Sequence, residues 1–442
     1  MNIYILYIIY YFFAKNKKEG NELSKVVEAK FNSEAVAGFN HRTAMEEASR
    51  CLLCIDAPCS KGCPAGTDPG KFIRSIRFRN PKGAAETIRE NNILGGTCAR
   101  ICPYDTLCEE ACSRCGIDRP IEIGKLQRYA IEQEQTFNMK TLTAPAAKKT
   151  EKVACVGSGP SSLACAAKLA REGYLVTIFE REAEAGGVLT YGIATTRLPK
   201  AVVAHDIAQV KALGVKFEFG KEVKAADLND FDAIFVGVGL WGTKIPNIKG
   251  TELKGVYAAV DFLKQARTKS GEFKPGENII VIGGGNVAVD CAVTAKLTGA
   301  KNVRLVYRRT IEEAPANMTE FEYVLSLGVG ITTEMAPAEI TGKDKVEFAM
   351  FDGRDGVSGA KFKADAVVFA IGQGAEKVDQ FTDAATDEKG SIKVNDKYIT
   401  NNAKVFAAGD IVNGGKTVVE AVAEGKEAAA SIITYLEKKG VK

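Results

Sequence analysis

A strand, a glycine-rich turn, a helix and a second strand occur in this order twice in the sequence. The first copy is "EKVACVGSGPSSLACAAKLAREGYLVTIFER" at residues 151–181, and the second begins about 126 residues later, at residue 277. A strand, a crossover helix and a parallel strand form the repeating unit of doubly wound α/β proteins, which bind ligands at the carboxyl ends of their strands. We therefore predict two Rossmann-like dinucleotide-binding domains, each built on a parallel sheet.

The first copy contains a complete dinucleotide fingerprint. Gly157 permits the tight turn, Gly159 lets the backbone approach a pyrophosphate, and the following helix presents its N-terminus to the phosphate charge. Ser162 stands where a third glycine is usual, and it is small enough to keep helix and strand close. Glu180 ends the second strand, where a carboxylate accepts hydrogen bonds from ribose hydroxyls. These residues predict a dinucleotide site.

The second copy differs at the end of its second strand. Its turn is Gly283–Asn286, and the strand ends with Arg308 and Arg309 where an acid would bind the ribose of NAD. Arginine at this position favours the 2′-phosphate of NADP(H), unless both arginines simply cover a sheet edge. The acidic residues Glu312 and Glu313 lie nearby in the sequence, so NADH is not excluded as the bound nucleotide. We predict an NAD(P)H site without choosing between the two nucleotides.

A third nucleotide feature lies near the C-terminus. Gly409 and Asp410 close a predicted strand, and a helix is predicted to begin around Thr417. An acid here binds the ribitol chain of a flavin, and a helix N-terminus stabilises negative charge on a reduced flavin ring. A Gly-Asp turn is common by itself, but after two Rossmann units it indicates a flavin site.

Nine of the twelve cysteines lie between residues 51 and 115. The block "RCLLCIDAPCSKGCP" has the spacing C-x2-C-x4-C-x3-C, and prolines follow Cys63 and Cys102. Zinc sites prefer two C-x2-C pairs or added histidines, and neither pattern is present. Short irregular spacings with prolines are typical of thiolate-ligated cubane clusters, so nine cysteines suit two clusters. A structural zinc or a set of free thiols is the alternative.

The remaining cysteines and the histidines narrow the chemistry. Cys155, Cys165 and Cys291 stand singly inside predicted strands or helices, and we interpret them as buried small side chains. The nucleotide-binding half has no C-x-x-C pair, so we expect electrons to leave through the clusters. His41 and His205 are the only histidines, and we interpret both as surface residues. Because the chain has so few histidines, Ser-His-Asp and Cys-His catalysis are excluded.

Length, charge and the N-terminal stretch define the broad class. A chain of 442 residues allows two or three domains, and a net charge of +4 is too small to indicate nucleic acid as a partner. The opening apolar run of about 12 residues is shorter than the roughly 20 that span a bilayer and lacks signal-peptide features, so we expect no stable membrane insertion. We expect a cytoplasmic protein. Thr43, three residues before Glu46, predicts a capping box for the helix before the first cysteines.

Several longer stretches resemble a known family. They are the first cysteine block, the first fingerprint, "GGTCARICPYDTLCEEAC", "PIEIGKLQRYAIEQE" and "AAGDIVNGGKTVVEAVAEGKEAA". From about Glu46 to its end, the chain resembles the flavoprotein half of dihydropyrimidine dehydrogenase, and most closely the separate NAD(P)H-accepting subunit of the bacterial two-subunit enzyme. The small subunit of glutamate synthase and its ferredoxin-coupled transhydrogenase relatives share this architecture.

The resemblance implies ligands for two [4Fe–4S] clusters and contacts for both nucleotides. One cluster would be held by Cys51, Cys54, Cys59 and Cys112, and the other by Cys63, Cys102, Cys108 and Gln127. Cys98 and Cys115 are left as non-ligands, and Gln127 separates this family from the glutamate-synthase-like branch, which tends to have an acid there. The implied FAD contacts are Gly157, Gly159, Glu180, Val188, Arg197, Val223, Asp410 and Thr417. The implied NAD(P)H contacts are Gly285, Asn286, Arg308, Arg309, Ala370, Ile371 and Gly372.

The expected fold is α/β with an N-terminal all-helical iron–sulfur domain, and with the NAD(P) domain inserted into the FAD domain. We predict an extension without fixed structure at residues 1–21 and a helical [4Fe–4S] domain at 22–145. The predicted FAD domain combines residues 146–248 and 375–442. The predicted NAD(P)H domain occupies residues 249–374.

The resemblance implies an electron-entry subunit of dihydropyrimidine dehydrogenase, an oxidoreductase of pyrimidine metabolism. NAD(P)H would reduce FAD, and electrons would pass through both clusters to a partner that interconverts uracil or thymine and their 5,6-dihydro forms. Because this chain lacks residues for pyrimidine chemistry, we expect an FMN-containing catalytic subunit with a pyrimidine-binding barrel and ferredoxin-like clusters, in a hetero-oligomer. The alternatives are the small subunit of glutamate synthase, a ferredoxin–NAD(P)+ oxidoreductase and a redox sensor.

Overall fold

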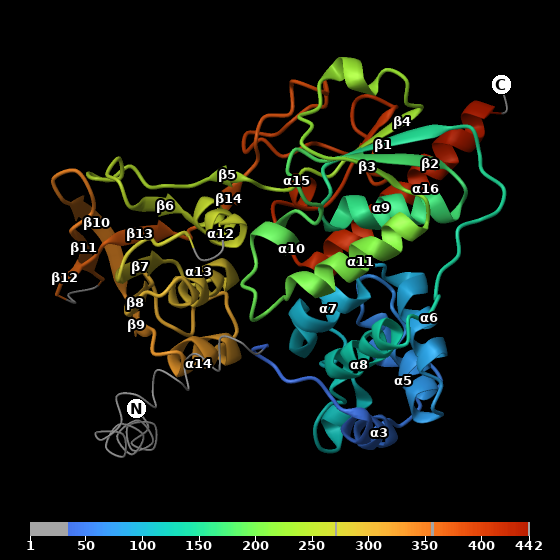
Figure 1. Cartoon of the computed structure of the whole chain (residues 1–442), viewed down its shortest axis with the longest axis horizontal. Helices are drawn as coiled ribbons and strands as arrows, with labels where there is room; N and C mark the ends of the chain where they lie inside the picture. The colour runs from blue at the N-terminus through green and yellow to red at the C-terminus, as the bar shows by residue number, and fades with distance from the viewer. Residues whose placement is uncertain (1–33, 270–271, 355–357, 441–442) are drawn as a thin grey trace.

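The structure is a computed structural model that describes residues 34–269, 272–354 and 358–440. Figure 1 shows three regions in this part of the chain: a bundle of helices, a first sheet with its helices directly beside that bundle, and a second sheet at the far side of the molecule. The predicted fold class, a helical region followed by parallel α/β regions, is confirmed. The predicted extension at residues 1–21 lies outside the described residues.

Short helices joined by irregular loops form the helical bundle. Asn80 caps one of them by accepting a hydrogen bond from the Gly83 N–H (2.9 Å), and Pro81 occupies the first turn, where a missing N–H costs no hydrogen bond. The helices are α3 (His41–Arg50), α4 (Pro58–Lys61), α5 (Pro69–Arg77), α6 (Pro81–Asn91), α7 (Gly95–Ile101) and α8 (Ile123–Thr136), with 3₁₀ turns at Tyr104–Thr106 and Ser113–Gly116. Most of the nine N-terminal cysteines therefore lie at helix ends or in loops.

The predicted start of α3 is wrong. The helix begins at His41 because the Asn40 side chain accepts a hydrogen bond from the Thr43 N–H (2.9 Å). Asparagine is a strong N-cap, and once it occupies that position Thr43 falls inside the first turn. The two histidines also differ from each other. His41 is exposed, whereas His205 is half-buried and contacts Glu134 through its Nε2 (3.0 Å), so the interpretation of His205 as a surface residue is corrected.

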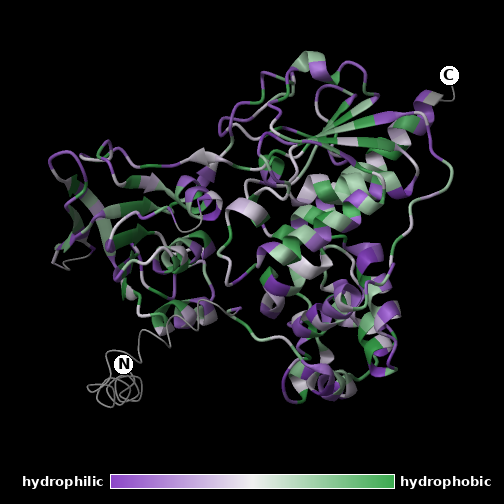
Figure 2. Ribbon diagram, viewed as in Figure 1, coloured by the Kyte–Doolittle hydropathy of each residue, from purple (hydrophilic) through white to green (hydrophobic). Residues whose placement is uncertain are grey.

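The first sheet has the strand order β15-β4-β1-β2-β3, and its strands pair in parallel. Hydrophobic residues gather on these strands and on α9 and α16, which share one core (Figure 2). The strands are β1 (Lys152–Val156), β2 (Leu175–Phe179), β3 (Lys216–Glu218), β4 (Ala233–Val236) and β15 (Val405–Ala407). The helices are α9 (Pro160–Arg171), α10 (Val188–Tyr191), α11 (Lys200–Ala212), α15 (Asp410–Asn413) and α16 (Val418–Gly440), with a 3₁₀ turn at Ala225–Leu228.

The second sheet has the order β6-β13-β7-β8-β9 and is also parallel. Three helices cover one face, and a small antiparallel sheet packs on the other. The strands are β6 (Val256–Ala258), β7 (Asn278–Ile282), β8 (Asn302–Val306), β9 (Gly330–Thr332) and β13 (Ala366–Phe369). The helices are α12 (Ala259–Thr268), α13 (Asn286–Leu297) and α14 (Met318–Ser326), and the small sheet contains β10 (Met335–Thr341), β11 (Phe348–Gly353) and β12 (Ala360–Lys363).

A pair of short antiparallel strands connects the two parallel sheets. β5 (Gly242–Thr243) takes the chain from the first sheet to the second, and β14 (Gln373–Gly374) brings it back. The second sheet is therefore inserted in sequence between β4 and β15, which is the expected order of elements. The residue bounds of the three predicted domains stay a prediction. No described helix, α16 included, is both long and apolar enough to cross a membrane.

Candidate functional site

A cavity of about 830 Å³ lies where the helical bundle and the two parallel sheets meet. The first sheet contributes the turn after β1, the residues after β2 and the start of α16, and the second sheet contributes residues of α13 and α14. The helical bundle contributes the loop 101–105, which contains Cys102. The cavity therefore joins the predicted flavin contacts to a predicted cluster ligand.

Glycine shapes the turn after β1. Gly157 has a φ of +88°, and a Cβ there would lie 2.8 Å from the Gly237 carbonyl oxygen, so no other residue fits without displacing the backbone. α9 begins directly after Gly159, which lines the cavity at the helix N-terminus. Free N–H groups at such an end bind phosphate groups. Ser162 is buried, and its hydroxyl donates to Gly237 O (3.5 Å), so its place is between helix and strand.

Glu180 follows β2 and is buried beside that turn. Its carboxylate accepts hydrogen bonds from the Ser158 N–H (3.0 Å), the Ser158 hydroxyl and the Glu182 N–H (2.9 Å). These donors fix the carboxylate at the cavity wall. A carboxylate in this position suits a ribose whose hydroxyls donate to it, and that role stays a prediction.

The C-terminal loop reaches the same cavity. Glu424 holds the loop because its carboxylate accepts a hydrogen bond from the Gly409 N–H (2.8 Å). Asp410 and Thr417 line the cavity, and burial raises the pKa of Asp410 above its ordinary value. The structure thus brings the C-terminal residues together with the turn after β1. The remaining predicted FAD contacts, which also line the cavity, are Val188, Arg197 and Val223.

The predicted NAD(P)H residues lie at the carboxyl ends of three neighbouring strands of the second sheet. Gly283–Asn286 follows β7, Arg308–Arg309 follows β8, and Ala370–Gly372 follows β13. This edge is where open parallel sheets bind their ligands. Asn286 lines the main cavity, whereas the two arginines are exposed to solvent. The three loops are therefore brought together at one edge, and their contacts with a nucleotide stay a prediction.

Arg197 connects the first sheet to the helices of the second. Its guanidinium pairs with Asp290 of α13 (2.8 Å) and Glu320 of α14 (2.6 Å). Burial opposes the charged form, but the two carboxylates raise the pKa of Arg197 above its ordinary value. Beside it, Oε2 of Glu320 is buried without a hydrogen-bond partner in the described part of the chain, and the hydroxyls of Thr196 and Tyr323 interact only with each other. Such groups at a cavity wall are available to a ligand.

Four thiols surround a small cavity in the helical bundle. They belong to Cys51, Cys54, Cys59 and Cys112, the set that the resemblance implies for one cluster. Burial and the neighbouring thiols raise the pKa of Cys59 to about 11. Neighbouring thiolates repel one another, and a bound metal would offset this repulsion because its positive charge balances the negative charge of the coordinating thiolates. Within the described ranges, no three His, Cys, Asp or Glu side chains are arranged to hold a single metal ion.

Cys63, Cys102 and Cys108 form a second group, in which Cys102 interacts electrostatically with the other two thiols and lines the main cavity. A hydrogen bond with Cys98, burial and the thiols of Cys108 and Cys63 raise the pKa of Cys102. Burial, followed by nearby negative groups, raises the pKa of Cys108. Cys98, predicted to be a non-ligand, therefore also contacts this group. Cys115 is exposed, and its Sγ donates to Glu109 O (3.3 Å).

Gln127 lies on α8, where that helix packs against α7. Its side-chain N–H donates to Gly95 O (2.8 Å), and its Oε1 accepts no hydrogen bond from the described residues. The amide oxygen is thus the atom that remains available to a metal. The residues present fit the proposed clusters, because two groups of thiols and a buried amide occur in the same bundle.

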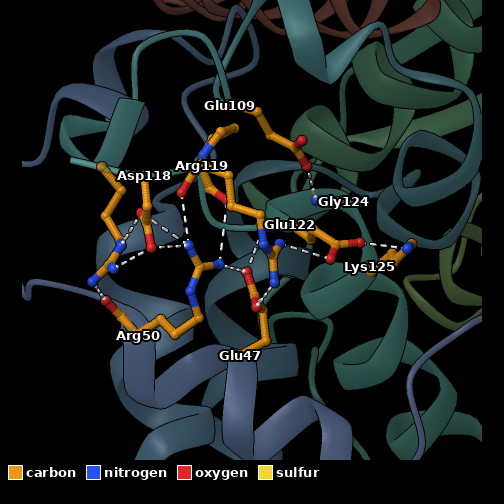
Figure 3. A network of polar contacts seen from close by, with 10 residues as sticks. Glu47, Arg50, Glu109, Asp118, Arg119, Glu122, Gly124 and Lys125 are labelled. Atoms are coloured by element: carbon orange, nitrogen blue, oxygen red, sulfur yellow. Dashed lines mark hydrogen bonds and ion pairs between the residues drawn. The ribbon is translucent and has the colours of Figure 1, made fainter. Parts of the chain in front are cut away.

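A network of ion pairs fixes the loops around the first thiol group (Figure 3). Arg50, at the end of α3, binds Glu47 (2.5 Å) and Asp118 (3.2 Å). Glu47 also binds Arg119 (3.0 Å). These contacts tie the segment before α8 to the helix before Cys51, so loops about 70 residues apart in sequence keep a fixed relation.

Other cavity residues carry no sequence signal. Trp241, the only tryptophan, lines the cavity, and its ring centroid lies 5.9 Å from the Arg181 guanidinium carbon. Tyr104 lines the cavity together with Cys102, and its hydroxyl donates to Ala99 O (2.9 Å). Both residues come from loops that meet only in the folded chain, so no local spacing identifies them.

Comparison with known proteins decides the family. Residues 28–139 match the family model described as dihydropyrimidine dehydrogenase domain II, 4Fe-4S cluster, and residues 151–425 match pyridine nucleotide-disulphide oxidoreductase. The NAD-dependent dihydropyrimidine dehydrogenase subunit PreT of Escherichia coli (strain K12) is 44% identical over 411 residues, which cover 91% of this chain and 97% of that protein. This chain belongs to the dihydropyrimidine dehydrogenase subunit family.

More distant relatives share the architecture of the dihydropyrimidine dehydrogenase subunit family. The glutamate synthase [NADPH] small chain of E. coli (strain K12) is 32% identical over 438 residues, covering 90% of this chain and 93% of that protein. Among solved structures, FprA from Mycobacterium tuberculosis has a TM-score of 0.56 and 19% identity, covering 66% of this chain and 86% of that chain. Thioredoxin reductase from Lactococcus lactis has a TM-score of 0.54 and 22% identity, covering 65% of this chain and 100% of that chain. These two structures support the fold.

Family membership confirms the predicted class and cofactors. The protein is an oxidoreductase of the dihydropyrimidine dehydrogenase subunit family, with FAD, [4Fe–4S] and NAD(P)H as its cofactors and co-substrate. The predicted resemblance is thereby confirmed, and the alternative of a zinc site is not supported. The role of each single residue, and the number of clusters, stay predictions.

Proposed function

We propose that this chain is the electron-entry subunit of a two-subunit dihydropyrimidine dehydrogenase. When bound, FAD takes a hydride from NAD(P)H, and two [4Fe–4S] clusters carry the electrons onward one at a time. The partner is an FMN-containing catalytic subunit with a pyrimidine-binding barrel and ferredoxin-like clusters, which interconverts uracil or thymine and their 5,6-dihydro forms. The two chains form a hetero-oligomer in the cytoplasm.

The continuity of the main cavity carries this proposal. It extends from the carboxylate of Glu180, past Arg197 and Asn286, to the loop of Cys102. Predicted flavin contacts, one residue of a predicted NAD(P)H loop and one predicted cluster ligand therefore line the same cavity. This arrangement supports electron transfer between the bound groups rather than three independent binding functions.

The residues of the first sheet have binding roles in this proposal. The α9 N-terminus at Gly159 neutralises the pyrophosphate, and Glu180 orients the adenosine ribose. Asp410 and the N-terminus of α16 at Thr417 face the flavin end, where the helix dipole favours negative charge on the ring. The 283–286, 308–309 and 370–372 loops hold NAD(P)H at the edge of the second sheet. None of these residues needs to donate or remove a proton.

The two groups of cysteines provide the route by which electrons leave the flavin. Cys51, Cys54, Cys59 and Cys112 would hold one cluster, and Cys63, Cys102, Cys108 and Gln127 the other. The second set contains the ligand that lines the main cavity, so we place it next to the flavin in the path. The identity of residue 127 favours the dihydropyrimidine branch over glutamate synthase, and the 44% identical relative supports the same choice.

The first experiment measures cofactors and partner dependence under anaerobic conditions. We reconstitute the purified chain, measure iron and flavin, and titrate it with NADH and with NADPH. We then add the FMN subunit and uracil. The expected result is about eight irons and one FAD per chain, bleaching of the flavin by a reduced nucleotide, and uracil reduction only in the presence of the partner.

Three results would contradict the proposal in different ways. Flavin without iron would overturn the cluster assignment. Iron and flavin with electron transfer to a glutamate-synthase large subunit, but not to the FMN subunit, would favour the glutamate synthase alternative. Rapid reduction of a free ferredoxin without any fixed partner would favour a ferredoxin–NAD(P)+ oxidoreductase.

A further inference from the structure

Consecutive residues of α16 contact two parts of the proposed flavin site. Glu424 holds the loop of Gly409 and Asp410 through the hydrogen bond from the Gly409 N–H (2.8 Å). Gly425 lies directly against the carbonyl of Ser161 in the first turn of α9, and a Cβ at position 425 would clash with that carbonyl. This part of α16 therefore lies in contact with the turn that is proposed to bind the pyrophosphate.

The next residue, Lys426, contacts the helical bundle. Its Nζ donates to Ala65 O (2.5 Å) and to Asn91 O (2.6 Å), which are 361 and 335 residues away in sequence. Ala65 belongs to the loop that follows Cys63, and the Ala65 side chain is buried. The Cys63 thiol is close enough to interact electrostatically with the Lys426 ammonium. One lysine of the first sheet's last helix thus holds the loop of a proposed cluster ligand.

A second cation strengthens the same junction. Arg171, at the end of α9, donates to Glu90 O (2.7 Å), beside the Asn91 carbonyl that Lys426 binds. Both carbonyls stand at the C-terminus of α6, where the helix dipole favours positive charge. The helices α9 and α16 therefore attach to α6 through charged contacts, and Lys426 extends this attachment to the Cys63 loop.

We propose that Lys426 is a positioning residue for the cluster of Cys63, Cys102, Cys108 and Gln127, and that its charge stabilises the reduced form of this cluster. The inference rests on the proposed function and deepens it. Reduction adds one electron to a group that already has thiolate ligands, so a nearby fixed cation favours the reduced form, while Lys426 gains or loses neither a proton nor a bond. For a unit charge about 10 Å from the cluster and an effective dielectric constant of about 20, Coulomb's law changes the equilibrium constant for reduction by a factor on the order of ten.

The test is an anaerobic redox titration of the holoenzyme followed by electron paramagnetic resonance. The variants are Lys426→Met, which removes the charge and the donor, Lys426→Gln, which keeps a shorter donor, and Lys426→Arg, which keeps the charge. Lys438→Met is the matched control, because it removes an exposed lysine from the same helix. Iron content, flavin content and the rate of flavin reduction by NADH or NADPH are measured on each variant.

We expect Lys426→Met and Lys426→Gln to disfavour reduction of one cluster about tenfold, which for one electron is a downward shift of about 59 mV. Lys426→Arg and Lys438→Met should match the wild type, and flavin reduction should be unchanged in all variants. Loss of half of the iron from Lys426→Met, restored in Lys426→Arg, would also support the positioning role.

If the Lys426→Met variant keeps its full iron content and an unchanged cluster potential, this inference is overturned but the proposed function is not. If the methionine variant does not fold, the same result in Lys426→Gln decides the question. Equal shifts in Lys426→Met and Lys438→Met would overturn it too, because the effect would then come from net charge. A wild-type chain that binds no iron would instead overturn the proposed function, on which the inference depends.

Discussion

Among single residues, Glu180 is a side chain that is held in its binding orientation before any ligand is present. Its carboxylate already accepts two backbone N–H groups, from Ser158 and Glu182, so it is held in one orientation at the cavity wall. A ribose therefore meets an acceptor that is fixed before binding, and little conformational entropy is lost when the hydrogen bonds form.

We predict that Glu180→Gln weakens FAD binding about 10- to 100-fold, because hydrogen bonds to a charged acceptor contribute about 1.5–3 kcal/mol. Glu218→Gln is the control, since this glutamate lies on the neighbouring strand β3 and its side chain is half exposed. The measurement is a fluorescence titration of the apoprotein with FAD. An unchanged dissociation constant for Glu180→Gln would show that the carboxylate does not bind the ribose.

Single residues also show where sequence reasoning stops. Gly157 and Glu180 were predictable because their roles depend on a turn and a strand within about 20 residues of each other. Thr43 was assigned wrongly as a cap because Asn40, three residues earlier, starts the helix by accepting the Thr43 N–H. Lys426 gave no signal at all, since its partners are more than 330 residues away.

At the scale of elements, α11 of the first sheet caps α7 of the helical bundle. The carboxylate of Asp206 accepts the Thr97 N–H (2.7 Å) at the start of α7 and also binds the guanidinium of Arg89 (2.6 Å). Arg89 is fully buried and binds Glu134 of α8 as well (2.7 Å). This network fixes α7, the helix that leads into Cys102, relative to the first sheet.

We predict that Asp206→Asn lowers the free energy of unfolding by about 3–5 kcal/mol, because it leaves the Arg89 charge partly unpaired in the interior. Glu86→Gln on α6 is the matched control. It removes an exposed ion pair with Lys82, and such pairs contribute about 0–1 kcal/mol. Urea unfolding followed by circular dichroism measures both variants. A loss below 1 kcal/mol for Asp206→Asn would mean that the other acceptors of Arg89, the Glu134 carboxylate and the Ile93 carbonyl, compensate for the missing charge.

Helix and strand order was predictable from the sequence, but the contacts between elements were not. The two strand–turn–helix copies appear as β1-α9-β2 and β7-α13-β8, because the alternation of apolar runs and glycine turns is local. The capping of α7 by Asp206 depends on a residue about 110 positions away. The pairing of Arg197 with Asp290 likewise joins two regions whose relative position no local pattern specifies.

For the whole molecule, the cavity shared by the three regions gives an intrinsic optical probe. Trp241 is the only tryptophan of the chain, lines this cavity, and stands just before β5, where the chain crosses from the first sheet to the second. A flavin ring bound in the cavity would therefore lie close to the indole and accept its excitation energy. This expectation depends on the assembly of all three regions, because each of them contributes to the wall.

We predict that binding of FAD to the apoprotein quenches most of the tryptophan emission, and that Trp241→Phe removes this emission altogether. The midpoint of quenching should shift to higher FAD concentration in Glu180→Gln, in step with its weaker binding, because both residues face the same cavity. Emission that stays constant while FAD binds stoichiometrically would place the flavin outside this cavity. In that case the continuous path from Glu180 to the Cys102 loop would lose its basis, even if the cysteines bind iron as proposed.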